Sequence, residues 1–320
     1  MSNPKKHHYL PQFYLRNFQY DSKAKSEQII VWNKDAEASS FIAAIDSTGC
    51  ERDFHTIDHD DSEQDRTSIE AIMSKVESIH SVLVQDILRD RLITNANQKE
   101  IPFFLSLMRN RNPSIKEFIR ESQATILTST ANMMQENGQF PEPPKQIKEV
   151  IDQGLPWFGI KISNWYLLQW MFYLANEPQI LSLLAQMNIS LLEAPKDDYF
   201  ISSDSPVAFY VPNYDKTTRP YGVGLVHKAV ELTLPISQKY ALLCSWNKNQ
   251  LNGLITQSDV KEINRRTIVM AQNYIYSHRQ CEDISDAIKQ HHHKRAGHNI
   301  SNLEHEAGSM MISRFIPVSD

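Results

Sequence analysis

The sequence predicts an α+β fold, in which a helix-rich first half packs with a mainly antiparallel sheet from the second half. Two observations support this prediction. Between residues 67 and 187, apolar residues recur at three- and four-residue spacing, the periodicity of amphipathic helices. From residue 189 onward, short apolar runs rich in β-branched and aromatic residues alternate with proline and glycine, a pattern typical of strands.

The first half is expected to contain one strand, at residues 28–33, followed by an acidic loop at 46–66. Helices are expected at residues 67–87, 98–109, 114–136, 145–153, 161–176 and 178–187. Thr67 and Glu70 have the spacing of a capping box at the start of the first helix. Pro113 separates the second helix from the third, because proline disfavours helical geometry in the residue before it.

The second half is expected to form most of the sheet. Strands are predicted at residues 189–193, 198–203, 206–211, 222–226, 230–235, 240–246 and 274–276, with one helix at 258–272. Residues 1–290 are therefore expected to form a single α+β domain, with linker-like residues at 137–144. Residues 291–320 are polar and are expected to be a mobile tail.

The amino-acid composition and charge indicate which classes of protein the chain can belong to. The chain has 320 residues, 41% of them hydrophobic, and a formal net charge of −5. It lacks the overall basic excess of most nucleic-acid binders, although a locally basic cleft stays open. Cys50, Cys244 and Cys281 are few and far apart, as in a protein whose thiols stay reduced. Without an apolar run long enough for a signal or a membrane span, the chain is expected to be cytoplasmic, with no membrane partner.

The first candidate site is the N-terminal segment. His8 and Arg16 lie inside a run of aromatic and leucine residues that extends to Phe18. A polar group buried among such residues needs partners, because leaving it unpaired costs about 1–3 kcal/mol. His8 and Arg16 therefore belong either to a functional site or to a structural hydrogen-bond network, and the sequence supports both interpretations equally.

A second candidate is Ser203-Asp204, where a predicted strand ends shortly before Pro206. A hydroxyl and a carboxylate at the end of a strand can project into a cleft. The simpler interpretation is that these side chains bond the backbone of a turn, as such residues often do.

Arg109 and Arg111 form a third candidate, at the end of the second predicted helix. Arginines there can bind phosphate through paired donors, or they can neutralise the negative end of the helix. Glu70 and Glu77 share one face of the preceding helix. Two such carboxylates can hold a metal or share acid–base work, but a capping role for Glu70 and a solvated Glu77 explain them as well.

These segments resemble an uncharacterised bacterial family of unknown function. His8-Tyr9-Leu10-Pro11-Gln12-Phe13-Tyr14-Leu15-Arg16-Asn17-Phe18 is similar to the family's opening signature, and Phe200-Ile201-Ser202-Ser203-Asp204-Ser205-Pro206-Val207 to a later block, in which Ser205 replaces the usual Asn. The segment from Leu234 to Leu243, Arg109 and the pair Ile263-Asn264 also have counterparts, so the resemblance extends over roughly residues 6–277. Some relatives look like single-gene phage-defence proteins, which implies a toxic or nucleic-acid-directed activity.

The leading hypothesis is a bacterial anti-phage defence effector that cleaves RNA. His8 would act as general acid or base, Asp204 would orient it or bind a metal, and Arg109 or Arg16 would stabilise the transition state. Arg111, Ser203 and Asn264 are the expected substrate contacts, and dependence on a divalent metal is left open. The alternatives are a non-enzymatic module that senses a phage protein, and a hydrolase of a nucleotide-sized metabolite, which the acidic net charge suits better.

Overall fold

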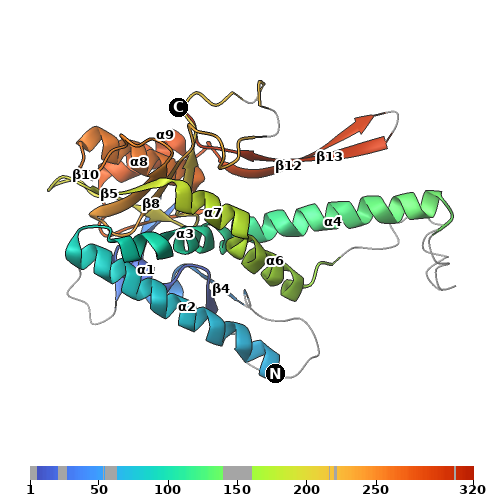
Figure 1. Cartoon of the computed structure of the whole chain (residues 1–320), viewed down its shortest axis with the longest axis horizontal. Helices are drawn as coiled ribbons and strands as arrows, with labels where there is room; N and C mark the ends of the chain where they lie inside the picture. Colours follow the sequence, from blue (N-terminus) through green and yellow to red (C-terminus); the bar gives the residue numbers. More distant parts are fainter. Residues whose placement is uncertain are drawn as a thin grey trace.

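The computed structural model confirms the α+β class (Figure 1). It describes residues 6–20, 27–52, 54, 63–139, 161–215, 217–219, 222–305 and 308–320. Helices dominate the first half and most strands come from the second half, as the change of periodicity near residue 189 predicts.

The larger sheet has five strands in the order β10-β5-β9-β8-β7. They are β5 (Asn188–Glu193), β7 (Ala208–Tyr210), β8 (Glu231–Pro235), β9 (Tyr240–Ser245) and β10 (Gly253–Leu254). All pairs are antiparallel except β10 with β5. The six residues of β9 are all buried, because this central strand has neighbours on both sides and apolar layers on both faces.

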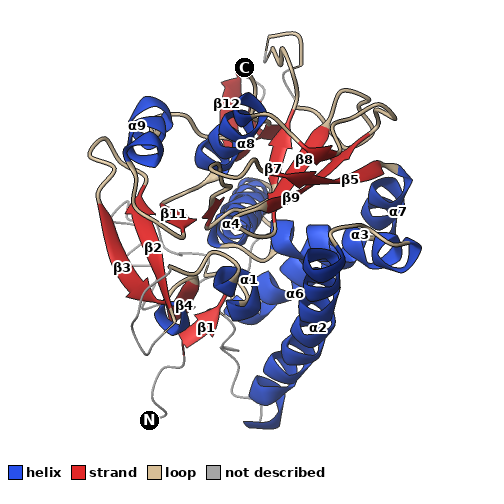
Figure 2. Cartoon of the chain, turned by 90° about the vertical axis from the view of Figure 1, so that its left-hand side faces the viewer, coloured by secondary structure: helices blue, strands red, loops and turns tan. Residues whose placement is uncertain are grey.

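The smaller sheet has the order β3-β2-β11-β6. Its strands are β2 (Gln28–Asn33), β3 (Ser40–Ala44), β6 (Ser202–Ser203) and β11 (Tyr274–Ser277). A separate two-stranded ladder pairs β1 (Lys6–His8) with β4 (Cys50–Arg52). In Figure 2, β2 and β3 lie at the left and the larger sheet at the upper right.

The helices cover the sheets on several sides (Figure 2). They are α1 (Gln12–Arg16), α2 (Glu63–Asp90), α3 (Asn95–Asn110), α4 (Pro113–Glu136), α6 (Asn164–Asn176), α7 (Pro178–Gln186), α8 (Gln257–Met270) and α9 (Glu282–His291), with a short 3-10 helix η1 (Ile45–Ser47). α3 packs against α6 and α7. It begins at a capping box in which Thr94 and Asn97 bond each other's backbone N–H groups. No described helix is long and apolar enough to cross a membrane.

The N-terminal signature is mainly a structural anchor. Leu10, Tyr14, Leu15 and Phe18 are fully buried in the main core. The Tyr14 hydroxyl donates to the Pro235 carbonyl at 2.8 Å and lies 2.7 Å from the Ser202 hydroxyl. The Asn17 amide donates to the Ile236 carbonyl at 2.9 Å. These bonds join the three long segments in which the sequence resembles the family, so folding explains why Tyr14, Asn17 and Ser202 are present.

Tyr14→Phe is expected to lower the free energy of unfolding by about 1–3 kcal/mol, because the buried Ser202 hydroxyl and Pro235 carbonyl lose their partner. Urea denaturation of the variant measures this loss. Tyr20→Phe is a matched control, since the Tyr20 side chain is half-buried at the edge of another cluster. An unchanged midpoint for Tyr14→Phe would mean that this hydroxyl does not hold the three segments together.

The structure differs from the sequence prediction in several elements. α2 begins at Glu63, so Thr67 and Glu70 lie inside the helix rather than at its start. Part of the predicted acidic loop is η1 and β4, and only residues 202–203 of the predicted strand 198–203 pair in a sheet. Residues 222–226 form no strand: Gly222 makes one bridge, and a turn follows at residues 225–226. The predicted helix 145–153 and residues 140–144 of the predicted linker lie outside the described residues.

The C-terminal residues form structure where a polar tail was predicted. α9 precedes two strands, β12 (Gly297–His305) and β13 (Gly308–Ile316), which pair as a long antiparallel hairpin. The hairpin packs along α4, and the two extend away from the sheets together (Figure 1). Val318 is buried and bonds the backbone beside β7. The residues of β12 are mostly polar, and the apolar residues of β13 do not alternate with polar ones, so the sequence pattern does not reveal these strands.

Candidate functional site

His8 lies at the end of β1, where the chain turns into α1. The backbone N–H groups of Tyr9 and Leu10 both donate to the Gly49 carbonyl, at 2.9 and 3.1 Å. Gly49 has a φ of +62°, and a Cβ there would come within 3.0 Å of the Leu10 Cβ. This turn therefore requires glycine, and it holds the backbone of the His8 segment in a fixed position.

Gln12 links His8 to Arg16. The Gln12 side-chain nitrogen lies 3.4 Å from His8 Nε2, and the Gln12 amide oxygen accepts from Arg16 Nη2 at 3.2 Å. Arg16 in turn donates through Nε to Glu27 at 2.7 Å. Because the Gln12 oxygen faces Arg16, its NH₂ group faces the imidazole, and His8 Nε2 must act as the acceptor. The neutral tautomer with a basic Nε2 is the one that this arrangement selects.

The environment also favours the neutral form of His8. The imidazole is half-buried, and this burial lowers its pKa below the usual 6.5. A hydrogen bond from the imidazole to the Ile45 backbone and the charge of Glu77 oppose the shift, while the charge of Arg111 adds to it. At neutral pH the side chain is therefore an uncharged base.

Arg111 lies directly behind His8 and is 4% exposed. Its Nη2 donates to the His8 carbonyl at 2.7 Å and bonds Glu77 Oε1 at 2.9 Å. The arginine follows the C-terminus of α3, and Glu77 comes from the middle of α2. The side chains of His8, Gln12, Arg16, Glu77 and Arg111 together are called the His8 site below.

His80 lies one helical turn after Glu77 on α2 and is 2% exposed. Its ring packs against Phe103 and Phe104, with centroids 5.3 and 5.1 Å away. Burial, with the nearby charge of Arg111, lowers the pKa of His80 to about 4. Folding therefore holds this imidazole neutral down to a much lower pH than the unfolded chain does.

The protein is expected to lose stability as the pH falls through this range. Between the unfolded value of 6.5 and the folded value of about 4, the unfolded state binds more protons, so the free energy of unfolding falls with pH. The contribution of His80 amounts to about 2 kcal/mol between pH 7 and pH 5. Denaturation of wild type and His80→Phe at both values isolates it, and an equal pH dependence of the two proteins would refute this assignment.

Asp204 is buried and serves the backbone. Its Oδ1 accepts from the Gln272 N–H at 2.8 Å, and its Oδ2 accepts from Asn273 and Tyr274 at 2.7 and 3.0 Å. Burial raises its pKa, while the three backbone bonds and the charge of Lys34 oppose the rise. Within the described residues no contact joins Asp204 to the His8 site. The sequence hypothesis that Asp204 orients His8 therefore has no geometric support.

Lys34 completes the same structural clamp. Its ammonium group donates to the carbonyls of Val269, Ala271 and Lys294, at 3.1, 2.7 and 3.0 Å. Lys34 thus satisfies the carbonyls at the C-terminus of α8, and Asp204 satisfies the N–H groups that follow. Burial, and secondarily repulsion from Arg295, lower the pKa of Lys34 to about 7.

The other predicted site residues lie elsewhere. Ser203 is buried in β6, where its hydroxyl accepts from the Ser205 N–H at 3.2 Å. The oxygen of the Asn264 side chain accepts from the Ile201 N–H at 3.1 Å, and its nitrogen donates to the Tyr199 carbonyl at 2.9 Å.

The Arg109 guanidinium lies 5.4 Å from the Phe209 ring and 5.1 Å from the Phe315 ring, and burial lowers the pKa of Arg109 to about 10. Arg109 therefore holds β13 against α3 through cation–π contacts.

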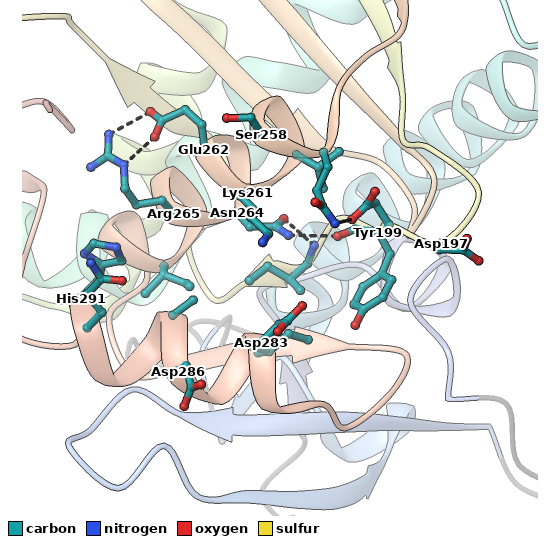
Figure 3. A pocket seen from close by; sticks show the side chains of 18 of the residues that line it. Asp197, Tyr199, Ser258, Lys261, Glu262, Asn264, Arg265, Asp283, Asp286 and His291 are labelled. Atoms are coloured by element: carbon teal, nitrogen blue, oxygen red, sulfur yellow. Dashed lines mark hydrogen bonds and ion pairs between the residues drawn. The ribbon is translucent and has the colours of Figure 1, made fainter.

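A pocket of about 560 Å³ lies between α8, α9 and residues 197–201 (Figure 3). Its rim carries charged side chains such as Asp197, Lys261 and Asp283. Of the predicted site residues it includes Asn264 alone, whose amide already bonds the adjacent loop. Among the described residues no cluster of three or more His, Cys, Asp or Glu side chains is arranged to hold a metal.

The fold and the His8 site define an α+β protein with a neutral histidine base beside two arginines and a carboxylate. The chain belongs to a family described as Protein of unknown function (DUF4238), whose model matches residues 6–280. No curated protein and no solved structure matches the chain.

The structure thus brings together three of the residues that the sequence singled out, His8, Arg16 and Arg111. Gln12 was part of the predicted signature but was not assigned a role. Its position four residues before Arg16, one turn along α1, is the signal that identifies it as a partner of Arg16. Glu77 was considered as a partner of Glu70, and its contact with Arg111 depends on packing between α2 and α3 that no local pattern reveals.

Proposed function

We propose that the protein hydrolyses phosphate esters at the His8 site and that it acts as a bacterial defence effector with RNA as substrate. One observation carries the proposal, the half-buried His8 imidazole whose basic Nε2 is positioned by Gln12 next to the charges of Arg111 and Arg16. The choice of RNA is motivated by the resemblance of some members of the family to single-gene phage-defence proteins.

In this proposal the nucleophile is a water molecule that takes the place of the Gln12 amide at His8 Nε2 and gives its proton to that nitrogen. The water oxygen forms a bond to phosphorus as the bond to the leaving oxygen breaks, the leaving oxygen takes a proton from bulk water, and His8 then returns its own proton to the solvent. Arg111 and Arg16 stabilise the negative charge that develops on the phosphoryl oxygens. General acid–base catalysis of this kind contributes about 10²–10⁴-fold to a rate.

The proposal is tested by incubating the purified full chain with single-stranded RNA and DNA, in Mg²⁺, in Mn²⁺ and in chelator. We expect RNA cleavage by the wild type and by His293→Gln, a control in which an exposed histidine far along the chain is replaced. We expect His8→Gln to be defective. Intact RNA and DNA under all three conditions would refute the proposal.

A non-enzymatic phage-sensing module is the second candidate, and one surface favours it. Ile72, Ile79 and Val82 on α2 are 56%, 56% and 61% exposed, and their spacing places them along one face of the helix. Apolar residues gathered on one face often mark a protein interface. If this candidate holds, Ile79→Glu abolishes the protection of cells while His8→Gln retains it. The reverse pattern supports the enzyme.

A further inference from the structure

Arg111 has more hydrogen-bond donors than the protein satisfies. Its Nη2 is paired with His8 and Glu77, but its Nε and Nη1 are buried and have no partner among the described residues. The buried Nε2 of the neighbouring His80 also has no partner there. The Arg111 side chain is therefore half-satisfied inside the protein, immediately behind the base of the His8 site.

Buried donors of this kind point to an acceptor that the chain itself does not supply. Leaving an N–H group buried without a partner is unfavourable, and more so when it belongs to a charged group. Glu77 is already bonded to Nη2, and the neighbouring His80 packs against the Phe103 and Phe104 rings. An anionic oxygen-rich group fits these donors best, because arginine N–H groups make their strongest hydrogen bonds with phosphate and carboxylate oxygens.

The depth of Arg111 restricts which phosphate can reach it. The side chain is only 4% exposed, so its free donors cannot contact a phosphate that carries a nucleoside on both sides. A terminal phosphate has three unsubstituted oxygens and one ester bond, and can enter a narrow site with its oxygens first. We infer that the His8 site recognises a terminal phosphate, on a mononucleotide or at the end of an RNA strand, through the free Nε and Nη1 of Arg111.

The charges around the site agree with a short substrate. Arg16 is paired with Glu27 and Arg111 with Glu77, while Lys6 bonds the Ser47 hydroxyl. A protein that binds along a polynucleotide presents several cations to successive phosphates. Both arginines of the His8 site are instead paired with carboxylates, and the whole chain has a net charge of −5.

This inference rests on the proposed function for the chemistry, and its own test is binding. Isothermal titration of His8→Gln, in which turnover is slowed by about 10²–10⁴-fold, compares AMP with adenosine. It also compares three versions of one short RNA: one with a 5′-phosphate, one with a 3′-phosphate and one with hydroxyls at both ends. We expect at least about tenfold tighter binding of the phosphorylated member of a pair. A preference confined to AMP identifies a nucleotide site, and a preference among the RNAs identifies a strand end.

Equal affinity for phosphorylated and unphosphorylated ligands, in both series, would overturn the inference. Arg111→Lys in the same background is expected to abolish the preference, because lysine cannot reproduce the donor geometry. The ligand comparison stands without this second variant if it does not fold. Phosphate preference without hydrolysis in the wild type would refute the proposed function alone, and hydrolysis that ignores the terminal phosphate would refute this inference alone.

Discussion

Replacing Asp204 with alanine is expected to lower the free energy of unfolding by about 3 kcal/mol or more. The change removes the acceptors for three backbone N–H groups, on Gln272, Asn273 and Tyr274, and each buried unpaired donor costs about 1–3 kcal/mol. It also removes the carboxylate whose charge favours the ammonium form of Lys34. Urea or thermal denaturation by circular dichroism measures the loss.

Asp197→Ala is the matched control, because this aspartate is exposed and lies on the segment that leads into the same strand. We expect it to change stability by less than about 0.5 kcal/mol. If Asp204→Ala were as stable as Asp197→Ala, the clamp formed by Asp204 and Lys34 would not hold the turn between α8 and β11. An Asp204→Ala protein that is as stable as the wild type but inactive would indicate a catalytic role for this carboxylate.

His8→Gln is expected to lower kcat/KM for phosphate-ester cleavage by about 10²–10⁴-fold, because glutamine cannot accept and return a proton. Glutamine is close to histidine in size and keeps a polar group near Gln12, so the fold should be preserved. The His8 backbone carbonyl, which accepts from Arg111, is unchanged by the substitution. Steady-state cleavage rates with an RNA substrate measure the effect.

His293→Gln makes the same chemical change at an exposed position and should leave the rate unchanged. The melting temperature of His8→Gln should stay near that of the wild type, since the loss concerns chemistry rather than packing. A variant that melts like the wild type and cleaves at the wild-type rate would show that His8 has no role in proton transfer.

Local patterns predict most of the fold. α3 and α4 follow from apolar periodicity and from Pro113, and β2, β5, β8, β9 and β11 follow from β-branched runs. The hairpin β12–β13 does not, because β12 is mostly polar, the apolar residues of β13 do not alternate with polar ones, and both strands pack along α4. The short strand β6 is likewise defined by its partner β11 rather than by its own two residues.

The site was predictable only in part. His8 and Arg16 stand out as polar residues in an apolar run, and both belong to one hydrogen-bond chain. The same reasoning selects Asp204, whose carboxylate bonds three backbone N–H groups instead. The sequence identifies polar residues that need hydrogen-bond partners when they are buried. Whether the partner is the backbone or a ligand depends on tertiary packing.

The pH dependence of kcat/KM is the most direct test of the central claim that His8 is the base. With wild type, the rate is expected to rise tenfold per pH unit at low pH and to level off at an apparent pKa below 6.5, because burial lowers the pKa of His8. In His8→Gln this inflection should vanish from the residual rate. An inflection of the same position and size in both proteins would contradict the account.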